Sequence, residues 1–135
     1  VIGIWEIYAY SVIDLPWPFY DRDTVLHILI SQNPRTHAVT IRIESVSGYY
    51  PQQRNRVRMP VVKSTWSVTP VGDGHVEVMF QGYGDPGGNL NSPFFRWFSG
   101  LASWEAPLST LAGLRAQIIQ KGLQDRRVNY ITESP

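Results

Sequence analysis

The chain has 135 residues, of which 43% are hydrophobic and 13% aromatic, so it forms one domain at most and has enough apolar side chains for a core. Its 12 basic and 11 acidic residues are well mixed and give a net charge of +1, which offers no electrostatic basis for nucleic-acid binding. It has no cysteine, which excludes disulfides and thiolate catalysis, and no apolar run of the roughly 20 residues that a membrane span requires.

The first residues already have the pattern of a strand. The sequence opens at Val1 without a methionine, so we expect part of the native protein to precede it. The sequence therefore leaves a signal peptide open, and a cytoplasmic location is the expectation.

Five consecutive strands are predicted in the first two thirds of the chain. They are rich in β-branched and aromatic residues, and the third alternates cleanly, with Val39, Ile41 and Ile43 on one side. Prolines after Asp14 end the first strand, Pro60 predicts a bulge in the fourth, and residues 72–74 predict a hairpin turn. Short connections favour an antiparallel meander. The predicted strands are residues 4–13, 24–32, 37–47, 57–69 and 75–84.

The apolar period becomes helical after Ser92, which is a suitable N-cap before Pro93. Pro107 should kink or split the helix near Ala106, and Gly122 or its neighbours should end it. The residues that share one helical face are Phe94, Trp97, Phe98, Leu101, Trp104, Leu108, Leu111, Ile118 and Ile119.

No motif points to an active site. Residues 82–87 match a GxGxxG pattern, but they follow the last strand of a meander, and no strand follows the helix, so a tight turn is the better interpretation. The histidines His27, His37 and His75 lack metal-ligand spacing. Asp21 and Asp23 flank Arg22, which favours charge-paired turn chemistry over acid–base catalysis.

Two surfaces have more than one interpretation. The basic run at residues 54–58 is a solvated rim or, less favourably, a contact for anionic lipid. Trp97 and Trp104 share a helical face that either packs on the sheet as ordinary core or covers a cavity.

The order of landmarks resembles the START (StAR-related lipid transfer) domain of the helix-grip, Bet v 1-like superfamily, in a bacterial-type member. The resemblance rests on six short motifs that occur in the order and spacing of the family. It covers residues 1–135 as a single domain, but only the C-terminal two thirds of the family domain. The motifs are Pro16-Trp17-Pro18, Arg22-Asp23, Val57-Arg58, Trp66 with Pro70, Asp85-Pro86-Gly87-Gly88, and Trp97-Phe98 followed by Pro107, Thr110, Leu111 and Leu114.

The resemblance implies an α+β helix-grip fold, in which a curved antiparallel sheet of about five strands wraps around a long C-terminal helix. It implies non-covalent binding, and in some members transfer, of a lipid in a tunnel between sheet and helix, without a cofactor and without catalysis. Sterol-binding members have a buried acid–arginine pair, and the corresponding positions here are Ala9 and Ile28. Both partners are absent, so the tunnel should be apolar at this point.

Strand alternation then selects the tunnel lining, because residues two apart share a face. Ser11 and Ile43 fall on the same inward face. The predicted ligand-binding residues are Trp5, Ile7, Ala9, Leu26, Ile28, Ile30, Val39, Ile41, Met59, Val61, Trp66, Trp97, Leu101, Trp104 and Leu108.

Two alternatives remain: a helix-grip enzyme such as a polyketide cyclase or aromatase, and a protein-recruitment module with a vestigial pocket. A transient membrane contact is also expected of a lipid carrier. Without the family's N-terminal strands the sheet should have an unpaired edge, which predicts a strand-swapped or edge-paired oligomer.

Overall fold

The computed structural model describes residues 2–89, 92–100 and 106–122. The chain divides into two compact units, Val1–Gly88 with Tyr130–Pro135, and Asn89–Asn129. The first contains the β-sheet, and the second contains two helices.

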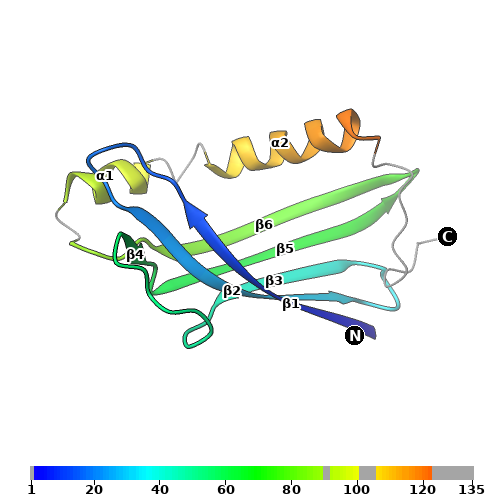
Figure 1. Ribbon diagram of the computed structural model, residues 1–135. Coiled ribbons are helices and arrows are strands. Elements are labelled where there is room, and N and C mark those ends of the chain that lie inside the picture. Colours follow the sequence, from blue (N-terminus) through cyan, green and yellow to red (C-terminus); the bar gives the residue numbers. More distant parts are fainter. Residues whose placement is uncertain (1, 90–91, 101–105, 123–135) are drawn as a thin grey trace. The chain divides into compact units, whose positions relative to one another are not determined.

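A six-stranded sheet makes up the first unit (Figure 1). The strand order is β1-β2-β3-β5-β6, and β4 pairs with β2 beside this path. Neighbours along the main path are antiparallel, as the meander predicts. Within the described residues, β1 pairs with β2 alone, so the expected partner strand at this edge remains a prediction. The strands are β1 Ile2–Ile13, β2 Asp21–Gln32, β3 Val39–Ser45, β4 Arg56–Arg58, β5 Val61–Gly72 and β6 His75–Asp85.

The turn between β1 and β2 follows from its prolines, which cannot donate to a strand ladder. The Phe19 amide donates to the Pro16 carbonyl at 3.1 Å, and the Leu15 amide donates to Asp21 Oδ1 at 3.0 Å. The strand after the turn therefore starts at Asp21, three residues earlier than predicted.

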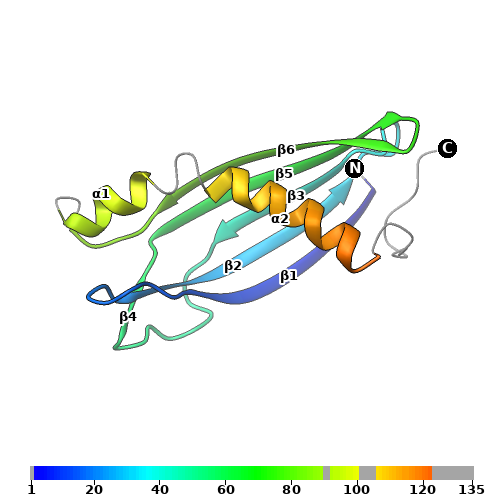
Figure 2. The same cartoon turned by 90° about the horizontal axis from the view of Figure 1, so that it is seen from above.

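The predicted strand at residues 57–69 is wrong in one respect, because Pro60 divides it into two strands. The shorter one, β4, runs parallel to the start of β2, with Arg56 opposite Asp21 and Arg58 opposite Asp23. Figure 2 shows β4 close to the turn between β1 and β2. The Met59 amide extends this pairing by donating to the Asp23 carbonyl at 2.9 Å. The sheet is therefore not purely antiparallel.

The hairpin between β5 and β6 is confirmed. Gly72, Asp73 and Gly74 all have positive φ, at 93°, 52° and 71°. The left-handed conformation costs little free energy here because two of the three residues are glycines, and aspartate tolerates it better than most residues.

The second unit contains α1 (Pro93–Gly100) and α2 (Ala106–Gln120). The N-cap prediction is confirmed, because Ser92 Oγ accepts a hydrogen bond from the Phe95 amide at 3.2 Å. Gly122, with φ of 57°, follows the end of α2 and donates to the Ile119 carbonyl at 3.4 Å. One long C-terminal helix is not confirmed, since two helices are described and residues 101–105 and 123–135 lie outside the described part.

Few of the described apolar side chains are fully buried. Val25 and Met59 are 4% and 5% exposed. Four polar residues of β2 are buried as deeply: Arg22, Asp23, Thr24 and Gln32. The other apolar side chains on β2, β3 and β5 are half-buried or exposed.

Candidate functional site

The strand register places most of the predicted binding residues on one face of the sheet, here called the apolar face. Ile7 lies opposite Ile28, and Ile28 lies opposite Ile43 on the next strand. Ile41 lies opposite Trp66, so the register also resolves the direction of Trp66. The predicted residues that share this face are Trp5, Ile7, Ala9, Leu26, Ile28, Ile30, Val39, Ile41 and Trp66.

The apolar face continues onto β6, although none of the predicted binding residues comes from this strand. Phe80 lies opposite Trp66, and their ring centroids are 4.6 Å apart. Phe80 also covers Gly82, because its Cζ lies 2.8 Å from where a Cβ at Gly82 would stand. Alternation of Val76, Val78 and Phe80 in the sequence was the signal that could have identified these residues.

The two remaining predicted residues of the sheet unit, Met59 and Val61, lie on different faces of the sheet. The terminal methyl of Met59 lies 3.6 Å from the position of a Cβ at Gly84, which has the same orientation as Gly82 and Phe80. Met59 therefore reaches the apolar face. Val61 lies opposite Asp85 and alternates with Val62, so it lies on the other face, and Val62 takes the inward position.

Two of the predicted helical residues lie in the described part of the chain, and both are exposed. Trp97 on α1 is 43% exposed and Leu108 on α2 is 63% exposed. Leu101 and Trp104 lie outside the described residues.

A hydrogen-bonded ion pair fixes the end of the sheet where β2 meets β4. Arg58 donates from Nε to Asp23 Oδ1 at 2.7 Å and from Nη2 to Oδ2 at 3.1 Å. Tyr10 donates its hydroxyl hydrogen to Asp23 Oδ2 at 2.8 Å, and Arg56 donates to the Tyr10 oxygen at 3.1 Å. Asp23 is 1% exposed, and the hydrogen bonds from Arg58 hold the pKa of its carboxyl below the ordinary range against the opposing effect of burial.

This network corrects the predicted role of the Asp–Arg–Asp segment. Asp23 pairs with Arg58 rather than with its neighbour Arg22, while Asp21 accepts the Leu15 amide. Arg22 donates from Nε to the Pro86 carbonyl at 3.0 Å and from Nη1 to the Tyr20 carbonyl. The motif residues therefore join distant turns, and their role here is structural.

Stacked aromatic side chains lie on the opposite face, over β1 and β2. Tyr8 stacks against His27 and Tyr49, each at 4.6 Å between ring centroids. A hydrogen bond with Tyr49, then burial and the charge of Glu6, raise the pKa of Tyr8 to about 12. These contacts hold the β3–β4 loop against the sheet.

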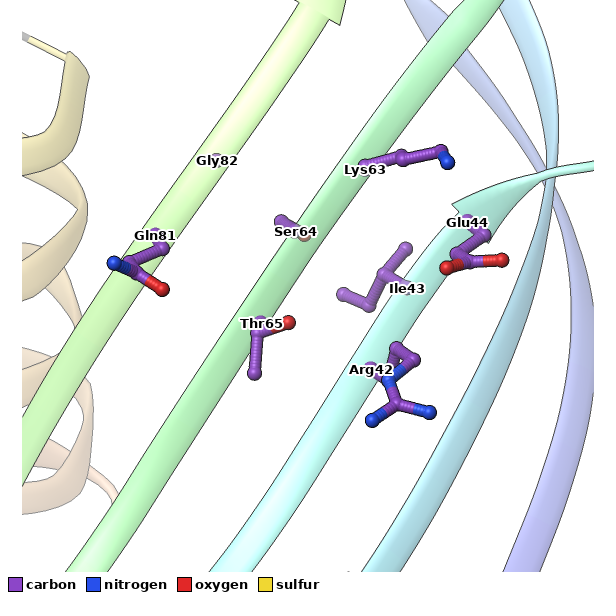
Figure 3. Close-up of a pocket in the computed structure, with 8 residues that line it drawn as sticks. All are labelled: Arg42, Ile43, Glu44, Lys63, Ser64, Thr65, Gln81 and Gly82. Carbon is purple, nitrogen blue, oxygen red and sulfur yellow. The ribbon is translucent and has the colours of Figure 1, made fainter.

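A shallow pocket of about 270 Å³ lies across β3, β5 and β6 (Figure 3). Its charged residues alternate along the strands with the apolar-face residues and therefore lie on the other face. They are two cations and one anion: Arg42, Lys63 and Glu44. The pocket shares only Ile43, Ser64 and Gly82 with the apolar face, so we do not assign the hydrophobic site to it.

Within the described ranges, no group of three or more His, Cys, Asp or Glu side chains could hold a metal ion. None of the helices described is both long and apolar enough to cross a membrane.

Comparisons with known proteins found one curated relative and two solved structures of similar fold. No family model matches the chain. The Pseudomonas aeruginosa protein PA1579 is 32% identical over 111 residues, which is 82% of this chain and 52% of that protein. A STAR-related lipid transfer protein from Xanthomonas axonopodis aligns with 34% identity and a TM-score of 0.69 over 84% of this chain and 60% of that one. Human STARD10 aligns with 18% identity and a TM-score of 0.62 over 81% of this chain and 46% of that one.

The sheet with its apolar face, followed by two helices, defines an α+β protein. The solved structures identify the type more closely: the chain has a START-like fold. It spans about half the length of the curated relative that it matches.

Proposed function

We propose that the chain binds a lipid or another hydrophobic ligand non-covalently against the apolar face of the sheet. The observation that carries this proposal is the alignment of apolar side chains across five adjacent strands, where most of them remain half-exposed. A contiguous exposed apolar surface of this kind is typical of a ligand-binding or interaction site. Covering some 400 Å² of ligand surface would contribute on the order of 10 kcal/mol, before the cost of ordering the ligand.

The proposal extends to a tunnel closed by the C-terminal helical segment. Trp97 and Leu108 are large apolar side chains that stay exposed on their helices, and such residues favour a hydrophobic contact. Together with Leu101 and Trp104 they would cover the ligand from the side away from the sheet.

The middle of the site should recognise hydrocarbon rather than a polar group. Ala9 lies opposite Leu26, and Ile28 lies opposite Ile7, so the two positions are diagonal neighbours on the apolar face. These positions correspond to the acid and arginine of sterol-binding members. Two apolar residues there support apolar contact and provide no acid–base group, which favours binding over a cyclase reaction.

Transfer would require contact with a bilayer, and the β1–β2 turn is the surface that we propose for it. Trp17 is 93% exposed and Tyr20 is 65% exposed, and both residue types favour the membrane interface. The basic run is a weaker candidate, because Arg56 is bonded to Tyr10 and Arg58 to Asp23.

Native mass spectrometry of the protein purified from its own lysate, followed by organic extraction, tests the binding proposal. A co-purifying lipid at one per chain is expected, and its mass would identify the ligand class. A protein that is empty and also ignores a panel of fluorescent lipids would contradict the proposal and favour a recruitment module.

A further inference from the structure

Four hydroxyl side chains form a diagonal line across the apolar face. Ser11 lies opposite Thr24, Ser45 lies opposite Leu26, and Ser64 lies opposite Ile43. Each hydroxyl is therefore opposite, or one diagonal step from, the next across four adjacent strands. We call this set the hydroxyl row; its members are Ser11, Thr24, Ser45 and Ser64.

The row crosses the apolar face, and apolar residues lie on both sides of it, including Val62 and Met59 beyond Ser64. On one side of it the strands continue through Ala9, Leu26 and Ile43 toward Trp5, Ile30 and Val39. From Ser11 to Trp5 this apolar part extends for six residues, or roughly 20 Å along the strand. A ligand that extends from the row toward Trp5 would therefore meet hydrocarbon over most of its length and hydroxyls at one end.

Thr24 supplies an independent observation at this row. The residue is 4% exposed, and its Oγ1 is buried without a hydrogen-bond partner. A buried hydroxyl without a partner carries a free-energy penalty, which a ligand group could relieve by supplying a donor or an acceptor. Ser45 has capacity as well, because its Oγ accepts from the Val62 amide at 2.9 Å and its own hydrogen is left to donate.

The described part of the face that such a ligand would cover beyond the row carries no charge, which favours an uncharged ligand body. In the described strands, no acidic or basic side chain lies on the apolar face between the row and Trp5, Ile30 and Val39. On the same face Arg22 lies two residues before Thr24, and it donates to the carbonyls of Pro86 and Tyr20. Hydroxyl groups can donate and accept equally, which suits a hydroxyl, ester or amide end of a ligand.

We propose that the hydroxyl row binds the polar end of a neutral amphiphile, whose hydrocarbon part lies along the apolar face toward Trp5. This inference rests on the proposed function and specifies its ligand class. Thr24 and Ser11 are the hydrogen-bonding residues, while the apolar residues supply most of the affinity without selecting the polar group.

Displacement titrations on the purified protein test this assignment with three probes: a pyrene-labelled hydrocarbon, monooleoylglycerol and oleate. The Ser11→Ala/Thr24→Val variant removes two hydroxyls and keeps the shape of Thr24. Thr40→Val is the matched control, since Thr40 lies on the opposite face, where it pairs with Ser31 and Ser67. The double variant should bind monooleoylglycerol roughly fivefold more weakly. Its affinity for the hydrocarbon should not change, and Thr40→Val should match the wild type with every probe.

Three outcomes would overturn the assignment while the proposed function stands. These are unchanged binding of monooleoylglycerol by the double variant, an equal loss for the hydrocarbon, and wild-type preference for oleate over monooleoylglycerol. A folded wild-type protein that binds none of the three probes would instead contradict the proposed function, and this inference with it.

Discussion

At the scale of single residues, Asp23 has the most consequential environment in the sheet. Its carboxylate is buried and receives three hydrogen bonds, two from Arg58 and one from Tyr10. A buried carboxylate is tolerated only while such partners remain. The pair therefore joins β4 to β2 and fixes where the chain turns into β5.

The stability that the Asp23–Arg58 pair contributes should depend on pH. Asp23 has a lowered pKa in the folded protein, so its stabilisation is present above the unfolded-state value of about 3.9 and is lost as pH falls through the folded-state value. Arg58→Ala should lower the free energy of unfolding by about 3 kcal/mol at pH 7. Denaturant titrations between pH 3 and pH 7 measure this, with Asp23→Asn as a companion whose difference from wild type should shrink at low pH. Equal stability of Arg58→Ala and wild type at pH 7 would refute this account of Asp23.

The proposed membrane contact depends mainly on one exposed side chain, that of Trp17. Trp17→Ser should weaken binding to phospholipid vesicles by about tenfold, since partial insertion of a large aromatic side chain contributes about 1.5 kcal/mol. Its thermal midpoint should not change, because Trp17 is 93% exposed. Tyr83→Ser is the control, as Tyr83 is 65% exposed on β6. Vesicle flotation that shows equal losses for both variants would remove the β1–β2 turn from the proposal.

At the scale of elements, two glycines should respond in opposite directions to the same substitution. Gly82→Ala places a methyl group 2.8 Å from the Phe80 ring, so this ring, which packs against Trp66, must shift at a cost of about 1 kcal/mol. Gly113→Ala in α2 meets no atom within 4 Å and should stabilise the helix by roughly 0.5–1 kcal/mol. Thermal unfolding compares the two variants, and a lower midpoint for Gly113→Ala would contradict the described helix.

The elements also show what the sequence could predict. Alternation, proline and glycine signals found the long strands, the hairpin and the helix cap, because all of these depend on local chemistry. The β4 strand was missed since three residues have no readable period and their parallel partner is 35 residues away. Val61 was assigned to the wrong face for a related reason: the break at Pro60 changes which residues alternate inward.

The candidate site was predictable where strands are regular and less so elsewhere. Residues on β1, β2 and β3 could be assigned by alternation, and the register brings them together. The same alternation along β6 also indicates Phe80, which the predicted set of binding residues does not contain. The pairing of Asp23 with Arg58 could not be derived locally, because neighbouring Arg22 offered an equally plausible partner in the sequence.

At the scale of the whole molecule, the central claim is that a hydrophobic ligand lies on the apolar face of a START-like sheet. Cross-linking with a lipid that carries a diazirine in its acyl chain, followed by residue-level mass spectrometry, tests this claim most directly. We expect adducts on Ile28, Ile41 and Trp66 and none on Tyr8 or Arg42, which lie on the other face. Adducts confined to Tyr8, Arg42 and their neighbours, with the apolar face unmodified, would contradict the account.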